Sequence, residues 1–148
     1  MLNSSLVRYN YYGGDYILAI INDLKNTLEA SVIYTIYNEY DKTPLAKRGN
    51  AFITIGLNSE VTSTKFQNGD ERFIKSKANV TITTIMTKNI STSFIYNYVE
   101  KNIINTLMYS NTFNVLSVDI KKPEYSKYLD RVQLPIDVTI EYVAKLSE

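Results

Sequence analysis

The sequence predicts an α+β fold: a mostly antiparallel sheet, two amphipathic helices packed on one face of it, and a projecting β-hairpin. Three observations support this prediction. Several segments alternate apolar and polar residues, as strands with one buried face do, and two others repeat apolar residues at helical spacing. The helices interrupt runs of adjacent strands, which gives the order α-β-β-β-α-β-β. Strands of a parallel sheet covered on both faces would instead be continuously apolar.

The composition is ordinary for a soluble globular chain. Residues 1–148 suit a single domain, with 45% hydrophobic and 21% charged residues. No stretch is long and apolar enough to span a membrane, and residues 1–16 lack a signal-peptide pattern, so we expect a cytoplasmic protein. The formal net charge of +1 argues against nucleic-acid binding as the main role.

Two residue types that serve catalysis and metal binding are absent, because the chain has no cysteine and no histidine. Disulfides and thiolate metal sites are excluded, and the commonest general base and transition-metal ligand are missing. Carboxylates, lysine, tyrosine and serine remain, so catalysis is not forbidden. The expectation is nevertheless a protein that is not an enzyme and has no catalytic, cofactor-binding or metal-binding residues.

The first half of the chain predicts a helix followed by strands. Asp15 follows a glycine pair and is a good N-cap residue, and apolar residues then recur at helical spacing over about 15–30. These apolar residues are Ile17, Ile20, Ile21, Leu24 and Leu28. The segment "VIYTIY", from Val32, is rich in β-branched and aromatic residues and predicts a strand before a polar loop. "AFITIGL" predicts the next strand, which continues as "NSEVTSTKF".

The dipeptide Asn68-Gly69 is the strongest hairpin signal, because a type I′ turn needs positive φ at both central residues. It joins a strand ending near Phe66 to one beginning near Glu71. Both arms carry polar residues on both faces, so this hairpin cannot pack on a core along its whole length. We expect its tip to project into solvent or against a neighbouring molecule.

The second half predicts a strand, a helix and two further strands. "NVTITTIMTKN" alternates apolar and polar residues and rejoins the sheet. A second helix is expected from about Ser91 or Ser93 to Tyr109, with an apolar stripe. The stripe consists of Ile95, Tyr98, Val99, Ile103 and Leu107. "FNVLSVDI" predicts the next strand, and "KKPEYSKYLDR" separates it from the last one.

The last strand, "VQLPIDVTIEY" from Val132 to Tyr142, alternates apolar and polar residues without interruption. One face is therefore core and the other polar. Pro135 cannot donate to a strand ladder, so it belongs on an edge strand or at a bulge. A long edge strand needs something that covers it or pairs with it. This strand therefore predicts a partner.

The charged residues suggest no chemical site. Asp137 and Glu141 lie about 13 Å apart along the polar face of the last strand, too far to share a metal ion. The glycine pair before the first helix lacks the other residues of a phosphate loop. Basic residues gather in the loops at 42–48 and 121–131 and near the hairpin at Lys75 and Lys77. Solvated loop charge is the simpler interpretation, and a positive lining beside a polyanion is the alternative.

The order of elements and the strand patterns together resemble those of phage tail terminator proteins. The stretches that carry the resemblance are "PLAKRGNAFITI", "ERFIKSKANVTITTI" and "LPIDVTIEYVAK", within a likeness from about Tyr16 to Lys145. It includes no diagnostic motif. The resemblance implies a small α+β subunit that forms a six-membered ring on the end of a tail tube. Such a ring ends tube polymerisation and provides the surface that joins the neck or head, and related rings cap headless, tail-like bacteriocins.

The resemblance also implies partners and a location. The partners would be other copies of the chain, the tail tube, and sheath or neck proteins, with DNA only passing through the ring lumen and no membrane. The protein would occupy the host cytoplasm during assembly and then the virion tail or tail-like particle. We expect the hairpin and the edge or polar face of the last strand to make the assembly contacts. The candidate contact residues are Lys65, Phe66, Asn68, Gly69, Glu71, Arg72, Phe73, Pro135, Asp137 and Glu141.

Other interpretations stay open at this point. Phe66 and Phe73 either point outward as contacts or fill the core. A small ferredoxin-like module that binds a ligand and regulates through dimerisation is the second function class. An enzyme that works through carboxylates or lysine is the third, and it would need a deep pocket of mutually close charged groups.

Overall fold

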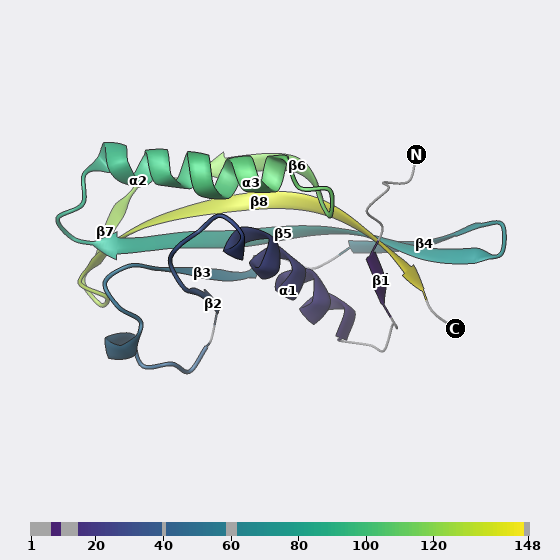
Figure 1. Cartoon of the computed structure of the whole chain (residues 1–148), viewed down its shortest axis with the longest axis horizontal. Coiled ribbons are helices and arrows are strands. Elements are labelled where there is room, and N and C mark those ends of the chain that lie inside the picture. The colour runs from purple at the N-terminus through teal and green to yellow at the C-terminus, as the bar shows by residue number, and fades with distance from the viewer. Residues whose placement is uncertain (1–6, 10–14, 40, 59–61, 147–148) are drawn as a thin grey trace.

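Two long antiparallel strands, β5 (Glu71–Thr87) and β8 (Arg131–Leu146), form the centre of the sheet in the computed structural model (Figure 1). The structure describes residues 7–9, 15–39, 41–58 and 62–146. The other strands are β1 (Val7–Tyr9), β2 (Ile36–Asn38), β3 (Phe52–Leu57), β4 (Thr62–Asn68), β6 (Asn114–Ile120) and β7 (Glu124–Ser126). The helical elements are α1 (Asp15–Glu29), the 3₁₀ turn η1 (Leu45–Lys47), α2 (Thr92–Tyr98), the π-helical segment η2 (Val99–Ile104) and α3 (Asn105–Met108).

Each outer edge of the central pair is divided among several strands. On β5, β4 pairs with the first half and β3 with the second half, both antiparallel. On β8, the other edge is shared by β1, β6 and β7. Among the described residues, only β1–β8 and β2–β3 are parallel pairs. The predicted α+β class with a mostly antiparallel sheet is confirmed.

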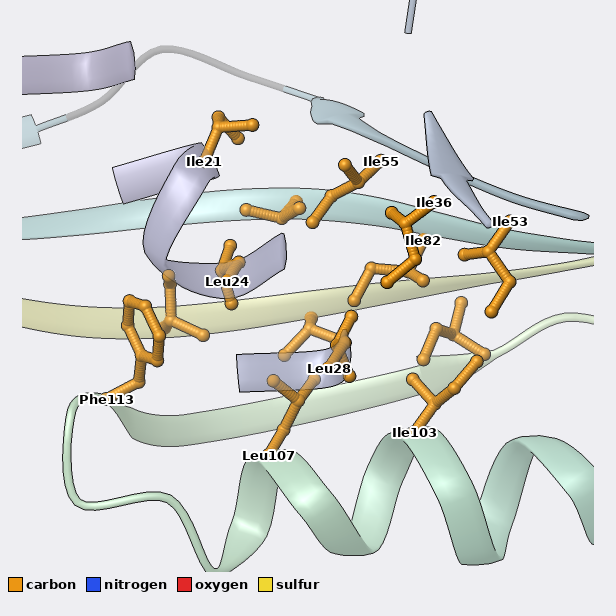
Figure 2. Packing of buried hydrophobic residues seen from close by; sticks show 14 of the residues in the cluster. Ile21, Leu24, Leu28, Ile36, Ile53, Ile55, Ile82, Ile103, Leu107 and Phe113 are labelled. Atoms are coloured by element: carbon orange, nitrogen blue, oxygen red, sulfur yellow. The ribbon is translucent and has the colours of Figure 1, made fainter. Parts of the chain in front are cut away.

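Both helices pack their apolar residues on the same face of the sheet, as predicted. α1 buries Ile20, Ile21, Leu24 and Leu28, while the side chain of Ile17 lies outside the described part of the chain. Figure 2 shows Ile21, Leu24 and Leu28 of α1 in the same cluster as Ile53 and Ile82 of the sheet and Leu107 of the second helix. The alternate residues of β8 from Leu134 to Tyr142 complete this core.

The second helix begins and ends close to its predicted bounds. Ser91 is its N-cap, and the Ser91 Oγ accepts a hydrogen bond of 3.1 Å from the backbone N–H of Phe94. The helix continues through α2, η2 and α3 to Met108. Its middle part, η2, is π-helical, which the sequence analysis did not predict.

The position of the proline in the last strand corrects one prediction. β8 is not an edge strand, because β5 pairs with one side of it and β1, β6 and β7 with the other. The β6 ladder ends at Ile120 opposite Ile136, and the β7 ladder begins at Glu124 opposite Gln133, with the register advanced by one residue. Pro135 lies between them, and its carbonyl accepts from Lys121 N at 3.1 Å. Its missing N–H therefore faces a break in the ladder.

Two predictions about the first half also need correction. The strand expected from Val32 begins only at Ile36 and pairs in parallel with β3. The hairpin turn is centred on Gly69 and Asp70, because Asn68 lies opposite Glu71. Of these two central residues only Gly69 has positive φ, at 64°. This pattern is that of a type II′ turn, not the expected type I′.

Candidate assembly surface

The β4–β5 hairpin projects beyond the helical layer at one end of the sheet, as predicted (Figure 1). β4 contributes Lys65, Phe66 and Asn68, and the start of β5 contributes Glu71, Arg72 and Phe73. The turn at Gly69 joins them. The structure therefore brings seven of the ten candidate contact residues together on one hairpin, whose β5 arm also pairs with β8 from Phe73 onward.

The two phenylalanines of the hairpin stack on each other. The ring centroids of Phe66 and Phe73 lie 5.1 Å apart, with ring planes 17° from parallel. Phe66 is half-buried, whereas Phe73 has an exposed fraction of 0%. Of the two rings only Phe66 therefore presents surface to a second molecule, and Phe73 supports it from behind. The contact itself stays a prediction.

Polar contacts hold the tip of the hairpin. Lys145 Nζ of β8 lies 2.6 Å from Glu71 Oε1. Arg72 Nη1 donates to Gln67 Oε1 at 3.0 Å, and Gln67 Nε2 donates to the Gly69 carbonyl at 2.8 Å. Residues of both arms also line an open hollow of about 290 Å³. It is lined by Lys65, Phe66, Gln67, Arg72 and Phe73.

The acidic candidates on β8 are engaged within the chain. Asp137 Oδ1 accepts a 2.7 Å hydrogen bond from Thr81 Oγ1, and Asp137 Oδ2 lies 3.6 Å from Lys121 Nζ. Glu141 Oε2 lies 3.4 Å from Lys75 Nζ at the base of the hairpin. Glu141 is thus connected to the hairpin, whereas Pro135 lies farther along β8, opposite Thr83. The candidate residues do not form one continuous site.

The face of the sheet away from the helices is polar and hydrogen-bonded. Asn58 Nδ2 donates to Asn79 Oδ1 at 2.9 Å, and Asn79 Nδ2 donates to Thr139 Oγ1 at 2.9 Å. Lys121 Nζ lies 2.7 Å from Asp119 Oδ2. This hydrogen bond, together with the charges of Asp119 and Asp137, raises the pKa of Lys121 above its ordinary value. The face is a network of paired groups.

The basic loop residues divide into structural and exposed ones. The guanidinium of Arg48 lies 4.6 Å from the ring centroid of Tyr37 and 5.4 Å from that of Phe52. Arg48 also donates to the carbonyls of Asp41 and Thr43. It holds the loop against the sheet, and is therefore not simply solvated charge. Lys42, Lys47, Lys122 and Lys127 are exposed.

An apolar surface beside β6 was missed by the sequence analysis. The buried residues of the second helix are spaced four apart. The residue that follows each of them forms a neighbouring flank, which consists of Tyr96, Glu100, Ile104 and Met108. The opposite flank faces the end of α1, where Ser31, two residues after the helix, has its Oγ 2.6 Å from Thr106 Oγ1. The missed flank therefore lies on the side of β6, which exposes Ile120 and Leu116 by nearly half. The four-residue repeat along the second helix was the sequence signal that could have revealed this surface.

A second open cleft lies at the other end of the sheet from the hairpin, where β5 ends. Its volume is about 390 Å³, and it is lined by Tyr34, Asn50, Ala51, Met86, Thr87 and Ile90. Tyr34 packs against Tyr98, with ring centroids 5.1 Å apart. Burial raises the pKa of the Tyr98 hydroxyl. The cleft has mainly apolar walls and can accept a small apolar group.

Within the described ranges, no three acidic side chains gather in a way that could hold a metal ion. Over the same residues, no helix has both the length and the apolar character needed to cross a membrane. No known protein-family profile matches the sequence, and no curated protein is significantly similar to it.

Proposed function

We propose that this protein is a structural assembly subunit that forms a ring of six copies on the end of a phage tail tube or tail-like particle. The ring ends polymerisation of the tube and provides the surface that joins the neck or head. The observation that carries the proposal is the projecting β4–β5 hairpin. The resemblance of the element order to that of tail terminators supports it.

A hairpin of this kind is suited to contacts with another molecule. Its tip, from Gln67 to Arg72, extends beyond the β5–β8 pairing and past the helices (Figure 1), and a two-stranded ribbon in water is marginally stable by itself. Phe66 keeps exposed surface beside this tip, supported from behind by Phe73. The basic residues of the segment 62–77 also outnumber the acidic ones. An amphipathic, basic projection favours docking on a neighbouring subunit or on the tube.

The first experiment measures the solution mass by light scattering after size exclusion, over a wide concentration range, with negative-stain images of each peak. The expected species has a mass of about 102 kDa, six copies of the 17.0 kDa chain, and appears as a ring. A strict monomer at all concentrations would favour the ligand-binding module described below, unless the protein is found on tails.

The second experiment places the protein on its particle. Tails or tail-like particles from the organism that encodes the chain are labelled with a gold-conjugated antibody against it. The expected label is at one end of each tube, at the neck. Label distributed along the tube, or none, contradicts the proposal whatever the solution mass.

The cleft beside Tyr34 supports a second candidate function, a small ligand-binding or regulatory module. Its volume of about 390 Å³ lies in the range of small-molecule sites. Native mass spectrometry of the protein as purified from cells tests this candidate. A bound small molecule that is lost in a Met86→Trp variant, in which an indole fills the cleft, would favour the module over the ring.

A further inference from the structure

The sheet has open strand edges on both of its sides. Among the described residues, β4 pairs only with β5, on the edge of β5 away from β8. β6 pairs only with β8, on the edge of β8 away from β5. Each of these strands has seven residues. Open edges of this length carry unpaired backbone donors and acceptors that can bind another strand.

Along a strand, alternate residues direct their backbone N–H and C=O groups to opposite edges, and this alternation shows which residues of β4 point to the open edge. Asn58 N donates to Asn79 O, so the odd-numbered residues of β5 bond toward β3 and β4. Their partners in β4 include Thr64 and Phe66, opposite Lys75 and Phe73. The alternate residues Ser63, Lys65 and Gln67 therefore direct their backbone N–H and C=O groups to the open edge.

The same reasoning applies to β6. Lys121 N donates to Pro135 O, so Asp119, two residues earlier, bonds toward β8 at Asp137. Val118 and Ile120 then direct their backbone groups to the open edge. Their side chains lie on the helix-covered face, because they are opposite the buried residues Val138 and Ile136.

The side chains on the two open edges match in direction. Lys65 lies opposite Ile74, which belongs to the helix-side core, so the edge-directed residues of β4 also carry side chains on the helix side. Residues that face each other across a ladder have side chains on the same face of the sheet. Joining β4 of one copy to β6 of the next therefore keeps the helices of both copies on one face.

Charge and apolar surface are complementary across such a joint. Lys65, the only charged residue of β4, has its side chain on the helix side, whereas Asp119 of β6 lies on the polar face and pairs with Lys121. On the helix side, the exposed Glu100 flanks β6, and Lys65 and Arg72 lie on the corresponding side of the hairpin. The aliphatic stems of these basic residues could cover the exposed surface of Ile120 and Met108.

We infer that a second copy of this chain binds by strand addition, with the open edge of β4 in one subunit pairing with the open edge of β6 in the next. Because the two surfaces differ, the contact is head-to-tail and can close into a ring. The sheet then continues from subunit to subunit, with all helices on one side and the polar face of β5 and β8 on the other. This inference rests on the proposed ring and specifies its contact.

The absence of native cysteine allows a direct test by disulfide cross-linking. A double variant with Lys65→Cys and Ile120→Cys, and a second with Lys65→Cys and Val118→Cys, are oxidised at low and high concentration. Residues directly opposite in a hydrogen-bonded pair have Cα atoms about 5.5 Å apart, within disulfide range. The expected result for at least one variant is a covalent ladder that ends at six subunits, because the ring closes.

Two controls distinguish specific head-to-tail cross-linking from other sources of disulfide-linked oligomers. A Lys65→Cys, Lys101→Cys variant places the second thiol on the exposed face of the helix, where no ladder is expected. Single-cysteine variants distinguish the contact type. Lys65→Cys alone should stay uncross-linked, whereas efficient dimers of that variant would indicate a two-fold contact and overturn the inference.

A proline variant tests the backbone contact itself. Lys65→Pro and Lys65→Thr both remove the charge, but only proline also removes the outward N–H. We expect Lys65→Thr to keep the assembled mass and Lys65→Pro to lose it, with unchanged circular dichroism. Equal assembly of the two variants, or assembly without any ladder, overturns edge pairing while leaving the ring intact. Protein that is monomeric even at roughly millimolar concentration also overturns edge pairing, and the gold label on tails then decides the proposed function separately.

Discussion

At the scale of single residues, one buried hydroxyl connects the sheet to the first helix. Tyr142 of β8 has an exposed fraction of 1%, and its hydroxyl donates a 2.6 Å hydrogen bond to Asp23 Oδ2 of α1. The Tyr142 ring also packs against Phe113, with centroids 5.3 Å apart. A hydroxyl at this depth needs a partner, and a carboxylate is a strong one. This contact fixes the position of α1 over β8.

We expect Tyr142→Phe to lower the free energy of unfolding by about 1–3 kcal/mol, because it removes a hydrogen bond to a charged group and retains the ring. Urea denaturation measures the change. Tyr128→Phe is the matched control, since Tyr128 is 91% exposed and its loss should change stability by less than about 0.5 kcal/mol. Equal stability of the two variants would show that the Asp23 contact contributes nothing.

A second residue pair gives a prediction about protonation. The Tyr125 hydroxyl donates a 2.5 Å hydrogen bond to Asp130 Oδ1, which lowers the pKa of Asp130 below its usual 3.8, with further lowering by Lys88. Tyr125→Phe should therefore raise the pKa of Asp130, measured by carboxyl ¹³C NMR. Tyr128→Phe should leave it unchanged.

The sign of the effect on stability follows from the direction of this pKa shift. A carboxyl group whose pKa is lowered in the folded state stabilises the fold above its unfolded pKa, and the contribution is lost as pH falls through the folded value. The wild-type chain should thus lose slightly more stability below about pH 4 than Tyr125→Phe does. A larger acid loss in the variant would contradict the assignment.

At the scale of elements, the second helix matches a four-residue repeat. Its buried residues Ile95, Val99, Ile103 and Leu107 are all four apart. An α-helix has about 3.6 residues per turn, so such a stripe would drift around it. The wider turns of η2, with bonds from i to i+5, counteract the drift and keep the stripe on the sheet. The π segment is therefore a consequence of packing.

Deleting Lys101, an exposed residue of η2, tests this explanation. The deletion removes one residue from the wide turns, so an α-helical backbone would place Val99, Ile103 and Leu107 four, seven and eleven positions after Ile95, on one face. We therefore expect the deletion to change the free energy of unfolding by less than about 1 kcal/mol. Inserting an alanine after Lys101 would instead rotate Ile103 and Leu107 by about 100° and should lower the free energy of unfolding by about 3–6 kcal/mol, the contribution of two buried aliphatic side chains. A deletion that destabilises the chain as much as the insertion would contradict this explanation of η2.

At the scale of the whole molecule, the arrangement of strands leaves an unpaired strand edge on each side of the sheet, within the described residues. β5 and β8 are much longer than the other strands, so several short strands share the outer edges of this pair. β4 and β6 end up on opposite sides, each with one unpaired edge among the described residues. A head-to-tail contact between unlike edges can repeat from subunit to subunit.

Assembly makes thermal stability depend on concentration, because the folded state is favoured by binding its neighbours. Raising the protein concentration to a hundredfold above the dissociation constant should add about 2.7 kcal/mol, which is about 5–10 °C in Tm for a chain of this size. Differential scanning calorimetry measures the shift. The Lys65→Pro variant should show a Tm that is independent of concentration, and a flat Tm in the wild-type chain would contradict assembly.

Much of the fold could be predicted from local pattern alone. Period-two alternation identified β8 and the main part of β5, and helical spacing identified α1 and the second helix, because side-chain direction in each element follows directly from backbone geometry. The hairpin at residues 68–71 also followed from its glycine. The three-residue strands β1 and β7 were missed, since segments this short carry too little pattern.

Several features depended on tertiary structure, because they involve residues far apart in sequence. The sequence by itself determined the α+β class, the projecting hairpin and the residues of the core, through the fixed periods of helix and strand. Tertiary pairing alone decided that β8 is central, that Pro135 lies at a break between β6 and β7, and that Phe73 is buried beneath Phe66. Strand neighbours are chosen by long-range contacts, which local pattern does not record, so the open edges of β4 and β6 became visible only in the folded chain.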